Sequence, residues 1–143
     1  MKHRISFFIW LSLLTLLMFF SSCGKDERCD YSIGITDFSI EPNTAYYQGI
    51  NVVGGYVYLK GGYRGVVVIR LAYDQFAAYE RACPLDGAAV VVTDDWGAEL
   101  LECPECHSQF ISRSDGIPMD GSATSCPLYQ YSTTYIDGVL YVY

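Results

Sequence analysis

Four cysteines with a regular spacing constrain this chain more than any other feature. They follow the pattern C-x19-C-x2-C-x19-C, at Cys83, Cys103, Cys106 and Cys126. A proline follows the first, second and fourth of them. Cys-Pro pairs favour turns over the interiors of strands and helices. We therefore expect loops from different parts of the chain to bring these four sulfur atoms together.

The N-terminus has the composition of an export signal. Lys2 and Arg4 come first, residues 5–20 form an apolar run, and small residues follow before Cys23. This order predicts a signal peptide, and the run is shorter than the ~20 residues that a membrane-spanning helix needs. The small residues before Cys23 resemble a lipobox. We therefore predict a lipoprotein signal peptide over residues 1–22 and lipidation at Cys23, where two acyl chains would anchor the protein to a membrane.

The residues after Cys23 indicate a destination. No aspartate follows Cys23 directly, which resembles lipoproteins released to the outer membrane. Lys25-Asp26-Glu27 resembles a short signal for display on the cell surface, although charged tethers are common and this indication is the weaker one. We expect a lipidated tether and a first strand over residues 23–50, followed by one folded domain over residues 51–143, at the outer membrane.

The charge of the chain excludes one class of partner. The formal net charge is −7, and the sequence contains no basic run after the signal peptide. Proteins that bind nucleic acid concentrate positive charge on the contacting surface. We therefore expect the membrane as a partner through the lipid anchor, and no nucleic acid.

Short runs of β-branched and aromatic residues dominate the chain after residue 50. They recur at a spacing of roughly 8–12 residues, with glycine-containing turns between them, which is typical of all-β sandwiches and small barrels. No amphipathic helix is indicated after the signal peptide. The runs cover residues 52–59, 65–71, 76–80, 90–92, 98–101, 129–131 and 139–143.

The chain is rich in tyrosine, with 13 residues of this type. Pairs such as Tyr56/Tyr58 and Tyr129/Tyr131 alternate onto one face of a strand. Tyrosine suits strands and has one polar end, which accounts for most of these residues. Any tyrosines left exposed would suit a carbohydrate or a protein partner.

From Cys83 onward the sequence resembles the Rieske iron–sulfur domain. The shared order is a Cys-Pro turn, a hairpin, a second Cys-Pro turn, a phenylalanine, a glycine turn, a Gly-x-Ala segment, Pro-Leu and a tyrosine. In this chain the matching residues are Cys83-Pro84-Leu85, Cys103-Pro104-Glu105-Cys106, Phe110, Gly116, Gly121-Ser122-Ala123, Pro127-Leu128 and Tyr131. The resemblance implies an all-β, Rieske-like fold of antiparallel sheets with a small rubredoxin-like loop subdomain.

The ligand positions depart from the family. A Rieske cluster needs two cysteines on one iron and two histidines on the other. Leu85 stands at the first histidine position and Cys106 at the second. His107, one place further on, stands where the family has a glycine. An ordinary Rieske cluster therefore cannot be built from these residues.

The cysteines can be in one of three states, and in the first they form disulfides and bind no metal. Exported proteins meet an oxidising compartment, where paired thiols are the default. The family resemblance implies that Cys83 and Cys103, which share one iron in relatives, lie close enough to form a disulfide. It also implies that Cys106 can pair with Cys126, because the loop before Pro127 covers the cluster in relatives. Cys29, in the tether, would be the unpaired cysteine.

Two metal-bound alternatives remain open after this first choice. One is an atypical [2Fe-2S] cluster, whose thiolate ligands would lower the reduction potential. The other is a zinc ion, for which C-x2-C is a suitable half-site, although no second C-x2-C is present. Both would use the same ligands, Cys83, Cys103 and Cys106, with Asp86, His107 or Cys126 in fourth place.

These observations predict a protein without catalysis of its own. Cys106 and His107 are adjacent, and neighbouring side chains rarely face each other as a nucleophile and its base must. We predict a Rieske-like outer-membrane lipoprotein whose cysteine-clamped loops form a binding or scaffold module. The alternative is an electron-transfer protein that binds an atypical [2Fe-2S] cluster through cysteine ligands.

Overall fold

The computed structural model describes residues 29–93 and 97–143. The predicted signal peptide over residues 1–22, the predicted lipidation site Cys23 and the turn residues 94–96 lie outside this part of the chain. Within it, none of the helical segments has the length and apolar character needed to cross a bilayer.

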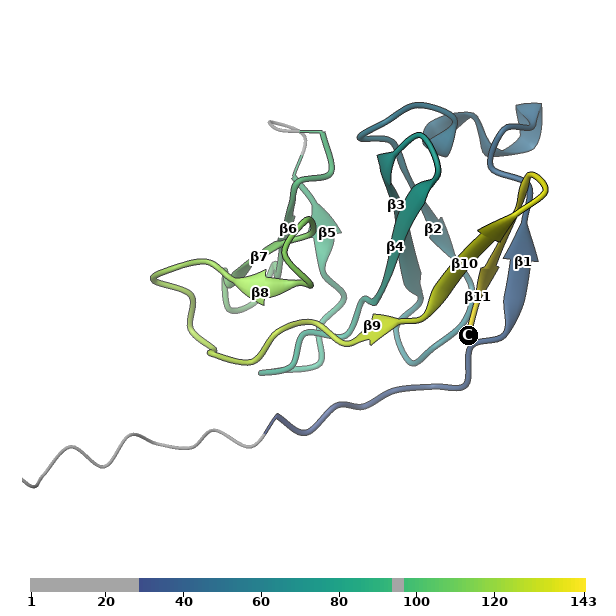
Figure 1. The fold of residues 1–143 in the computed structure, drawn as a ribbon. Helices are drawn as coiled ribbons and strands as arrows, with labels where there is room; N and C mark the ends of the chain where they lie inside the picture. Colours follow the sequence, from purple (N-terminus) through teal and green to yellow (C-terminus); the bar gives the residue numbers. More distant parts are fainter. Residues whose placement is uncertain (1–28, 94–96) are drawn as a thin grey trace, which may run out of the picture.

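In the described residues, eleven strands form three antiparallel sheets (Figure 1). The first sheet has the order β1-β11-β10, with β1 at Phe38–Ile40, β11 at Val139–Val142 and β10 at Thr133–Ile136. The middle sheet has the order β2-β3-β4-β9, at Tyr56–Leu59, Val66–Ala72, Gln75–Glu80 and Gln130–Tyr131. The third has the order β5-β6-β7-β8, at Val91–Val92, Leu100–Glu102, Gln109–Ile111 and Ile117–Pro118. A short 3-10 helix, η2, covers Ala45–Ile50.

The middle sheet is covered on both faces, which explains the sequence of β3. Successive side chains of a strand point to opposite faces, and all five residues from Val66 to Arg70 are buried. One face contributes to a core shared with β5–β7, and the other to a core shared with β1, β11 and η2. The first core includes Val67, Ile69, Tyr79, Leu101 and Phe110, and the second includes Val66, Val68, Ala78, Leu140 and Val142.

The C-terminal hairpin of β10 and β11 is closed by an Asp-Gly turn. Ile136 pairs with Val139, so the turn between β10 and β11 consists of Asp137 and Gly138 alone. Both have positive φ, 51° and 84°, the conformation of the tight turns that match the twist of paired strands. The Asp-Gly pair therefore closes the hairpin as the sequence predicts.

The N-terminal part of the domain differs from expectation. The sequence predicts a loosely alternating strand within residues 33–40, but only Phe38–Ile40 pairs, with β11. Residues 29–37, called the strap below, are extended and run beneath the molecule from the β5–β8 end toward β1 (Figure 1). Ile35 is 98% exposed, so the alternation in the strap does not bury a face.

The strap nevertheless packs on the domain. A Cβ atom on Gly34 would lie 2.2 Å from the carbonyl oxygen of Gly62, so the two backbones approach as only glycine allows. The Tyr31 ring lies 5.7 Å from that of Tyr129. The Tyr131 hydroxyl oxygen lies 3.4 Å from the Gly34 carbonyl oxygen. These contacts hold the strap against the turn between β2 and β3 and against β9.

A buried carboxylate joins the elements next to the first Cys-Pro turn. Glu80 is 1% exposed and ends β4. Its Oε2 accepts hydrogen bonds from the Tyr63 amide at 2.7 Å and the Tyr131 hydroxyl at 2.8 Å. Its Oε1 accepts from the amides of Arg64 at 2.8 Å and Ala82 at 3.1 Å. One side chain thereby fixes the β2–β3 turn, the end of β4 and β9 relative to one another.

Replacement of this carboxylate should destabilise the fold. In Glu80→Gln, the amide nitrogen would face backbone donors, so buried N–H groups lose their acceptor. We expect a loss of about 2–4 kcal/mol in the free energy of unfolding, measured by urea denaturation. Glu41→Gln, at an exposed position, is the matched control and should change stability by less than about 0.5 kcal/mol. Equal stability of the two variants would contradict the assigned role of Glu80.

The same network predicts a loss of stability in alkali. Burial, with the Glu80 carboxylate beside it, raises the pKa of Tyr131 to about 12. The folded protein therefore keeps the phenol proton between pH 10 and 12, where the unfolded chain loses it. Stability contributed by this group is present below about pH 10 and is lost as the pH rises toward 12, by up to about 2–3 kcal/mol.

The check is the pH dependence of urea denaturation between about pH 9 and 12. Tyr131→Phe should show a shallower decline than the native chain, whatever its stability at neutral pH. Identical slopes for the two proteins would show that Tyr131 does not titrate as its environment indicates.

Candidate metal centre

The first Cys-Pro turn lies between β4 and β5. The Cys83 amide donates to the Ala88 carbonyl at 2.8 Å, and the Gly87 amide donates to the Cys83 carbonyl at 2.8 Å. Gly87, the fifth residue of the turn, has a φ of +73°. The two hydrogen bonds curl residues 83–88 into a closed loop, so the side chains of its first and fourth residues project on the same side.

The second turn, between β6 and β7, repeats this construction. The Cys103 amide donates to the Ser108 carbonyl at 3.0 Å, and the His107 amide donates to the Cys103 carbonyl at 2.9 Å. His107 occupies the fifth position with a φ of +57°, the region that favours glycine. The two loops are therefore equivalent, with Asp86 of the first loop in the place of Cys106 in the second.

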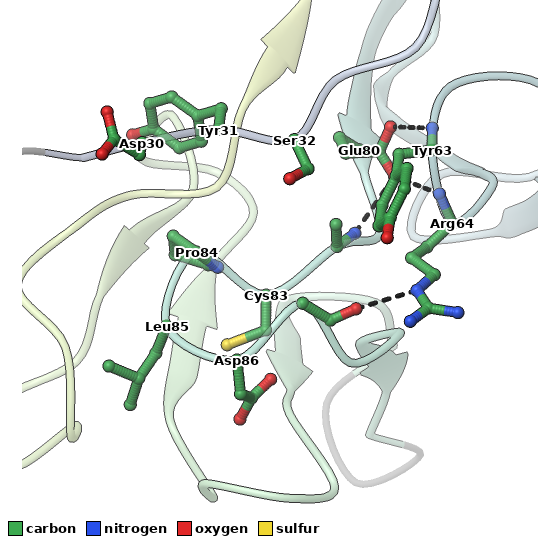
Figure 2. Close-up of a pocket in the computed structure, with 12 residues that line it drawn as sticks. Asp30, Tyr31, Ser32, Tyr63, Arg64, Glu80, Cys83, Pro84, Leu85 and Asp86 are labelled. Atoms are coloured by element: carbon green, nitrogen blue, oxygen red, sulfur yellow. Dashed lines mark hydrogen bonds between the residues drawn. The ribbon is translucent and has the colours of Figure 1, made fainter.

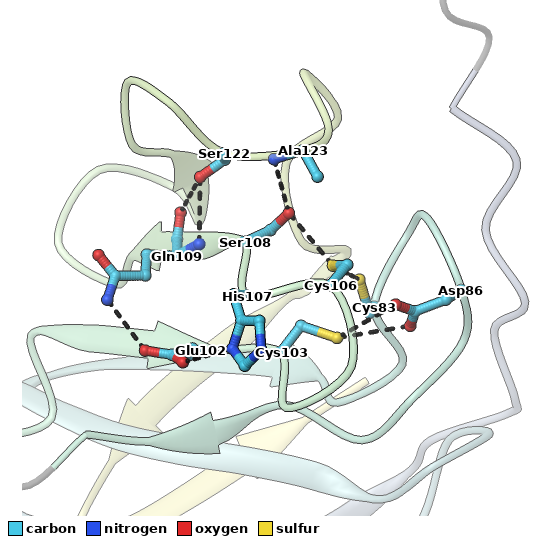
Figure 3. Close-up of polar contacts among 10 residues, drawn as sticks. All are labelled: Cys83, Asp86, Glu102, Cys103, Cys106, His107, Ser108, Gln109, Ser122 and Ala123. Atoms are coloured by element: carbon cyan, nitrogen blue, oxygen red, sulfur yellow. Dashed lines mark hydrogen bonds and ion pairs between the residues drawn. The ribbon is translucent and has the colours of Figure 1, made fainter.

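Contacts between the loops follow this equivalence (Figure 3). The Cys83 and Cys106 sulfurs are 3.6 Å apart. The Cys103 sulfur lies 3.4 Å from both carboxylate oxygens of Asp86. Each first-position cysteine thus contacts the fourth-position residue of the opposite loop. All four ligand atoms lie within 4.8 Å of one another.

The four ligand residues differ in how far they are exposed to solvent. Cys83 and Cys103 are buried, Cys106 is half-buried and Asp86 is exposed. Ser108, fully buried, accepts a hydrogen bond from the Cys106 thiol at 3.2 Å and another from the Ala123 amide at 3.0 Å. The loop that contains Ala123 therefore supports the second turn from behind.

The protonation of the group follows from its surroundings. Burial raises the pKa of the Cys83 thiol and that of the Cys103 thiol. Burial also opposes ionisation of Asp86, but hydrogen bonds from the Ala88 amide and from the thiols outweigh it and lower the pKa of the carboxyl. A carboxylate therefore faces two protonated thiols, and a bound cation would displace their protons.

A cavity of about 260 Å³ lies between the strap and the first loop (Figure 2). Its walls include Tyr31 and Ser32 of the strap and the backbone of the first loop. The Cys83 sulfur and the Asp86 carboxylate lie on the side of the loop away from Ser32. The cavity therefore lies between the strap and the ligand loop, and Cys83 and Asp86 are among its lining residues.

His107 does not join the group, although the sequence made it a candidate fourth ligand. Its side chain is 76% exposed, and its Nδ1 lies 3.3 Å from the Glu102 carboxylate. Glu102 also accepts a hydrogen bond from the side-chain amide nitrogen of Gln109 at 2.9 Å. The positive φ of His107 turns its side chain toward this strand-end pair and away from the sulfurs.

Cys126 is also absent from the group, which corrects the predicted pairing. It forms a disulfide with Cys29, 97 residues away in the sequence. The predicted Cys106–Cys126 disulfide is therefore wrong, and Cys29 is not the unpaired cysteine. The reason is the strap, which returns along the domain and brings Cys29 to Cys126.

Among the described residues, the other three cysteines, Cys83, Cys103 and Cys106, are free thiols, so the predicted Cys83–Cys103 disulfide is not formed. The nearest sulfur across the loops from Cys83 belongs to Cys106, because the first position of one loop faces the fourth position of the other. The structure thus brings together Cys83, Cys103, Cys106 and Asp86 of the predicted site residues, and leaves out Cys126 and His107.

The sequence contained a signal for this arrangement that spacing between cysteines alone does not show. Cys-Pro-Leu-Asp-Gly over residues 83–87 and Cys-Pro-Glu-Cys-His over residues 103–107 are two versions of one five-residue turn. The second half-site, which is not a C-x2-C, is the C-x2-D of Cys83 and Asp86. Asp86 therefore occupies the same position in the first loop as Cys106 does in the second.

The donor set decides which metal group fits. A Rieske cluster requires two histidines on one iron, and the only histidine among residues 29–93 and 97–143 is His107, outside the group. A tetrahedral ion with ~2.3 Å bonds to sulfur and ~2.0 Å to oxygen separates two sulfurs by ~3.8 Å, and sulfur from oxygen by ~3.5 Å. The two closest separations, 3.6 Å between Cys83 and Cys106 and 3.4 Å between Cys103 and Asp86, are compatible with a single ion, and all four atoms lie within 4.8 Å of one another.

Comparison with solved structures agrees with the fold. The ferredoxin of carbazole 1,9a-dioxygenase from Nocardioides aromaticivorans IC177 aligns with a TM-score of 0.50 and 16% identity, over 78% of this chain and 97% of that chain. A chain of the complex of reduced oxygenase and oxidized ferredoxin in carbazole 1,9a-dioxygenase aligns with a TM-score of 0.49 and 23% identity, over 63% of this chain and 81% of that one. No protein-family model matches the sequence, and no curated protein matches it significantly. The likeness to the ferredoxin confirms the all-β, Rieske-like fold.

The corrected disulfide can be tested directly. Peptide mapping of unreduced protein should yield a peptide of Cys29 linked to Cys126. Because this bond closes a loop of nearly the whole domain, Cys29→Ser/Cys126→Ser should lose about 2–5 kcal/mol of unfolding free energy. A linked peptide of Cys106 and Cys126, or an unchanged stability of the double variant, would contradict this pairing.

Proposed function

We propose that the protein is a non-catalytic module in which one zinc ion clamps the two loops of a Rieske-like fold. The ligands would be Cys83, Asp86, Cys103 and Cys106. The observation that carries the proposal is the pair of equivalent loops, whose first and fourth residues meet crosswise at tetrahedral spacing. A zinc ion there would join β4–β5 to β6–β7 and fix the end of the domain as a rigid binding surface.

Four protein ligands favour a structural role over a catalytic one. Structural zinc sites are closed by four protein ligands, whereas catalytic sites keep a position for water or substrate. Two of the thiolates would come from buried positions. Binding energy at such a site adds to folding energy, which suits a small subdomain whose strands β5 and β8 have only two residues each.

Export also favours zinc over a preassembled cluster. The predicted signal has Lys2-His3-Arg4 in place of a twin arginine, so we infer that the chain crosses the membrane unfolded. An iron–sulfur cluster assembled in the cytosol would be lost on that route. Zinc needs no assembly machinery and can bind after export.

We further propose that Cys23 carries the lipid anchor and that the domain belongs to the outer membrane. The signal-like N-terminus and the lack of aspartate after Cys23 support this localisation. Only residues 24–28 separate Cys23 from the disulfide-bonded Cys29, at most about 20 Å of extended chain. The disulfide would therefore hold the domain close to the membrane surface.

A second candidate function is electron transfer, with iron at the same ligands as a single ion or as an atypical [2Fe-2S] cluster. The observation that favours it is access: Cys106 is half-buried, and Leu85, beside Asp86, is 46% exposed. A redox partner can therefore approach the ligand atoms closely. A two-iron cluster would need its terminal ligands further apart than one ion does, so the spacing favours a single ion.

Metal analysis of the native protein separates these functions. Protein purified anaerobically from its own membranes should be colourless and contain one zinc per chain. Visible absorbance with one or two irons per chain would overturn the zinc clamp and support the electron carrier. A metal-free protein would contradict both.

Substitution of Asp86 tests the ligand set. Asp86→Ala should weaken zinc binding by more than the about 10- to 100-fold that loss of an outer-shell residue costs. Asp86→Cys should restore tight binding, because it completes a second C-x2-C half-site. Affinity is measured by competition with a chelator. Asp120→Asn, exposed and outside the loops, is the control, and an Asp86→Ala protein that retains its zinc as the control does would refute the role of Asp86.

A further inference from the structure

The fold gathers positive charges that are scattered in the sequence. Lys60, Arg64 and Arg81 line a groove of about 420 Å³ at the end of β2 and the following turn. No acidic residue lines it. The chain as a whole has a net charge of −7, so this groove is a positive site on an acidic protein.

The other cations of residues 29–93 and 97–143 are already engaged. Arg70 is buried and donates to backbone carbonyls and to the Asn43 side chain at 2.7 Å. Arg113 forms an ion pair with Glu99 at 3.0 Å. Lys60, Arg64 and Arg81 form no ion pair with any carboxylate in the described part of the chain. Their charge is therefore left for a ligand.

Arg81 is held in place from two sides. Its Nε donates to the Val90 carbonyl at 3.0 Å, and its guanidinium lies 4.0 Å from the centroid of the Tyr58 ring. Tyr58 is itself fixed, because its hydroxyl accepts a hydrogen bond from the Val92 amide at 2.8 Å. A guanidinium fixed in this way loses little conformational freedom when it binds a ligand.

Arg64 is held in the same manner. Its Nε donates to the Gly87 carbonyl at 2.9 Å, and its guanidinium lies 5.1 Å from the Tyr63 ring centroid. Its amide is bound to the Glu80 carboxylate, while its side chain extends away from that carboxylate (Figure 2). Each arginine thus uses Nε for the protein, and the terminal N–H groups of the fork remain for an acceptor.

We propose that this groove binds a doubly charged oxyanion, a phosphate group. Three cations exceed what a single carboxylate requires, and two fixed arginine forks suit the several oxygens of a phosphate. The Tyr58 and Tyr63 rings lie against the guanidinium groups of Arg81 and Arg64 and so help to orient their charge. Free phosphate, a phosphorylated sugar and a lipid headgroup share this chemistry.

Calorimetric titration of the full-length protein with inorganic phosphate at low salt tests the proposal. Phosphate should bind with one site, and acetate should bind more weakly. Arg64→Gln and Arg81→Gln should each weaken phosphate binding about tenfold or more, as expected for loss of a charge-assisted hydrogen bond. Arg113→Gln removes the same charge outside the groove and should bind as the native protein does.

Several outcomes would overturn the proposal. They are the absence of phosphate binding, an equal effect of Arg113→Gln, and acetate binding as tight as that of phosphate. Lys60→Gln, at an exposed position, should also weaken binding, and it keeps the test valid if the arginine variants are unstable. Sedimentation with phosphatidylglycerol and phosphatidylcholine vesicles then identifies the source: retention by the first alone indicates a lipid headgroup, and retention by neither indicates a soluble phosphate.

Discussion

The Glu80 carboxylate is the constraint on which the rest of the structure depends. Removing a carboxylate from water costs several kcal/mol, and Glu80 forms no ion pair with a cation in the described part of the chain to offset the loss. Four donors supply the compensation, from a turn, from the chain leading to Cys83 and from the Tyr131 hydroxyl. Because the Tyr131 hydroxyl also contacts the strap at Gly34, elements from both ends of the domain meet around this charge.

The candidate metal centre takes its geometry from Glu80. Cys83 follows Glu80 by three residues, so the position of the first loop is set by a fully bonded side chain. The second loop is set by strand pairing between β6 and β7 and by Ser108. Two loops with the same internal hydrogen bonds then present their ligands crosswise. The residues in these loops decide the chemistry: histidines in place of Leu85 and Cys106 would divide the ligands between two irons. Asp86 and Cys106, at the fourth position of each loop, instead form a compact set with Cys83 and Cys103 that suits one ion.

The features that could be predicted from the sequence are local ones. Many of the strand positions, the Asp137-Gly138 turn and the gathering of three thiols follow from short-range patterns. The short strands β7, β8 and β10 lie outside the runs of β-branched and aromatic residues. The Cys29–Cys126 disulfide could not be predicted, because it depends on an irregular strap whose path is fixed by glycine contacts and not by any periodic pattern. Asp86 was recognised as a candidate but not as the equal of Cys106, since the equivalence lies in backbone hydrogen bonds. The positive groove depends on residues that only the sheet brings together.

The segment from Cys83 to Val90 connects the two sites. Its first and fourth side chains face the metal centre, while its carbonyls at Gly87 and Val90 accept hydrogen bonds from the two groove arginines. The same closed turn that positions the ligands therefore also positions Arg64. Since a bound ion would stiffen this turn, it would also stiffen the acceptor that holds the guanidinium. The loop over residues 83–90 thus has two uses in one short segment, one for its side chains and one for its backbone.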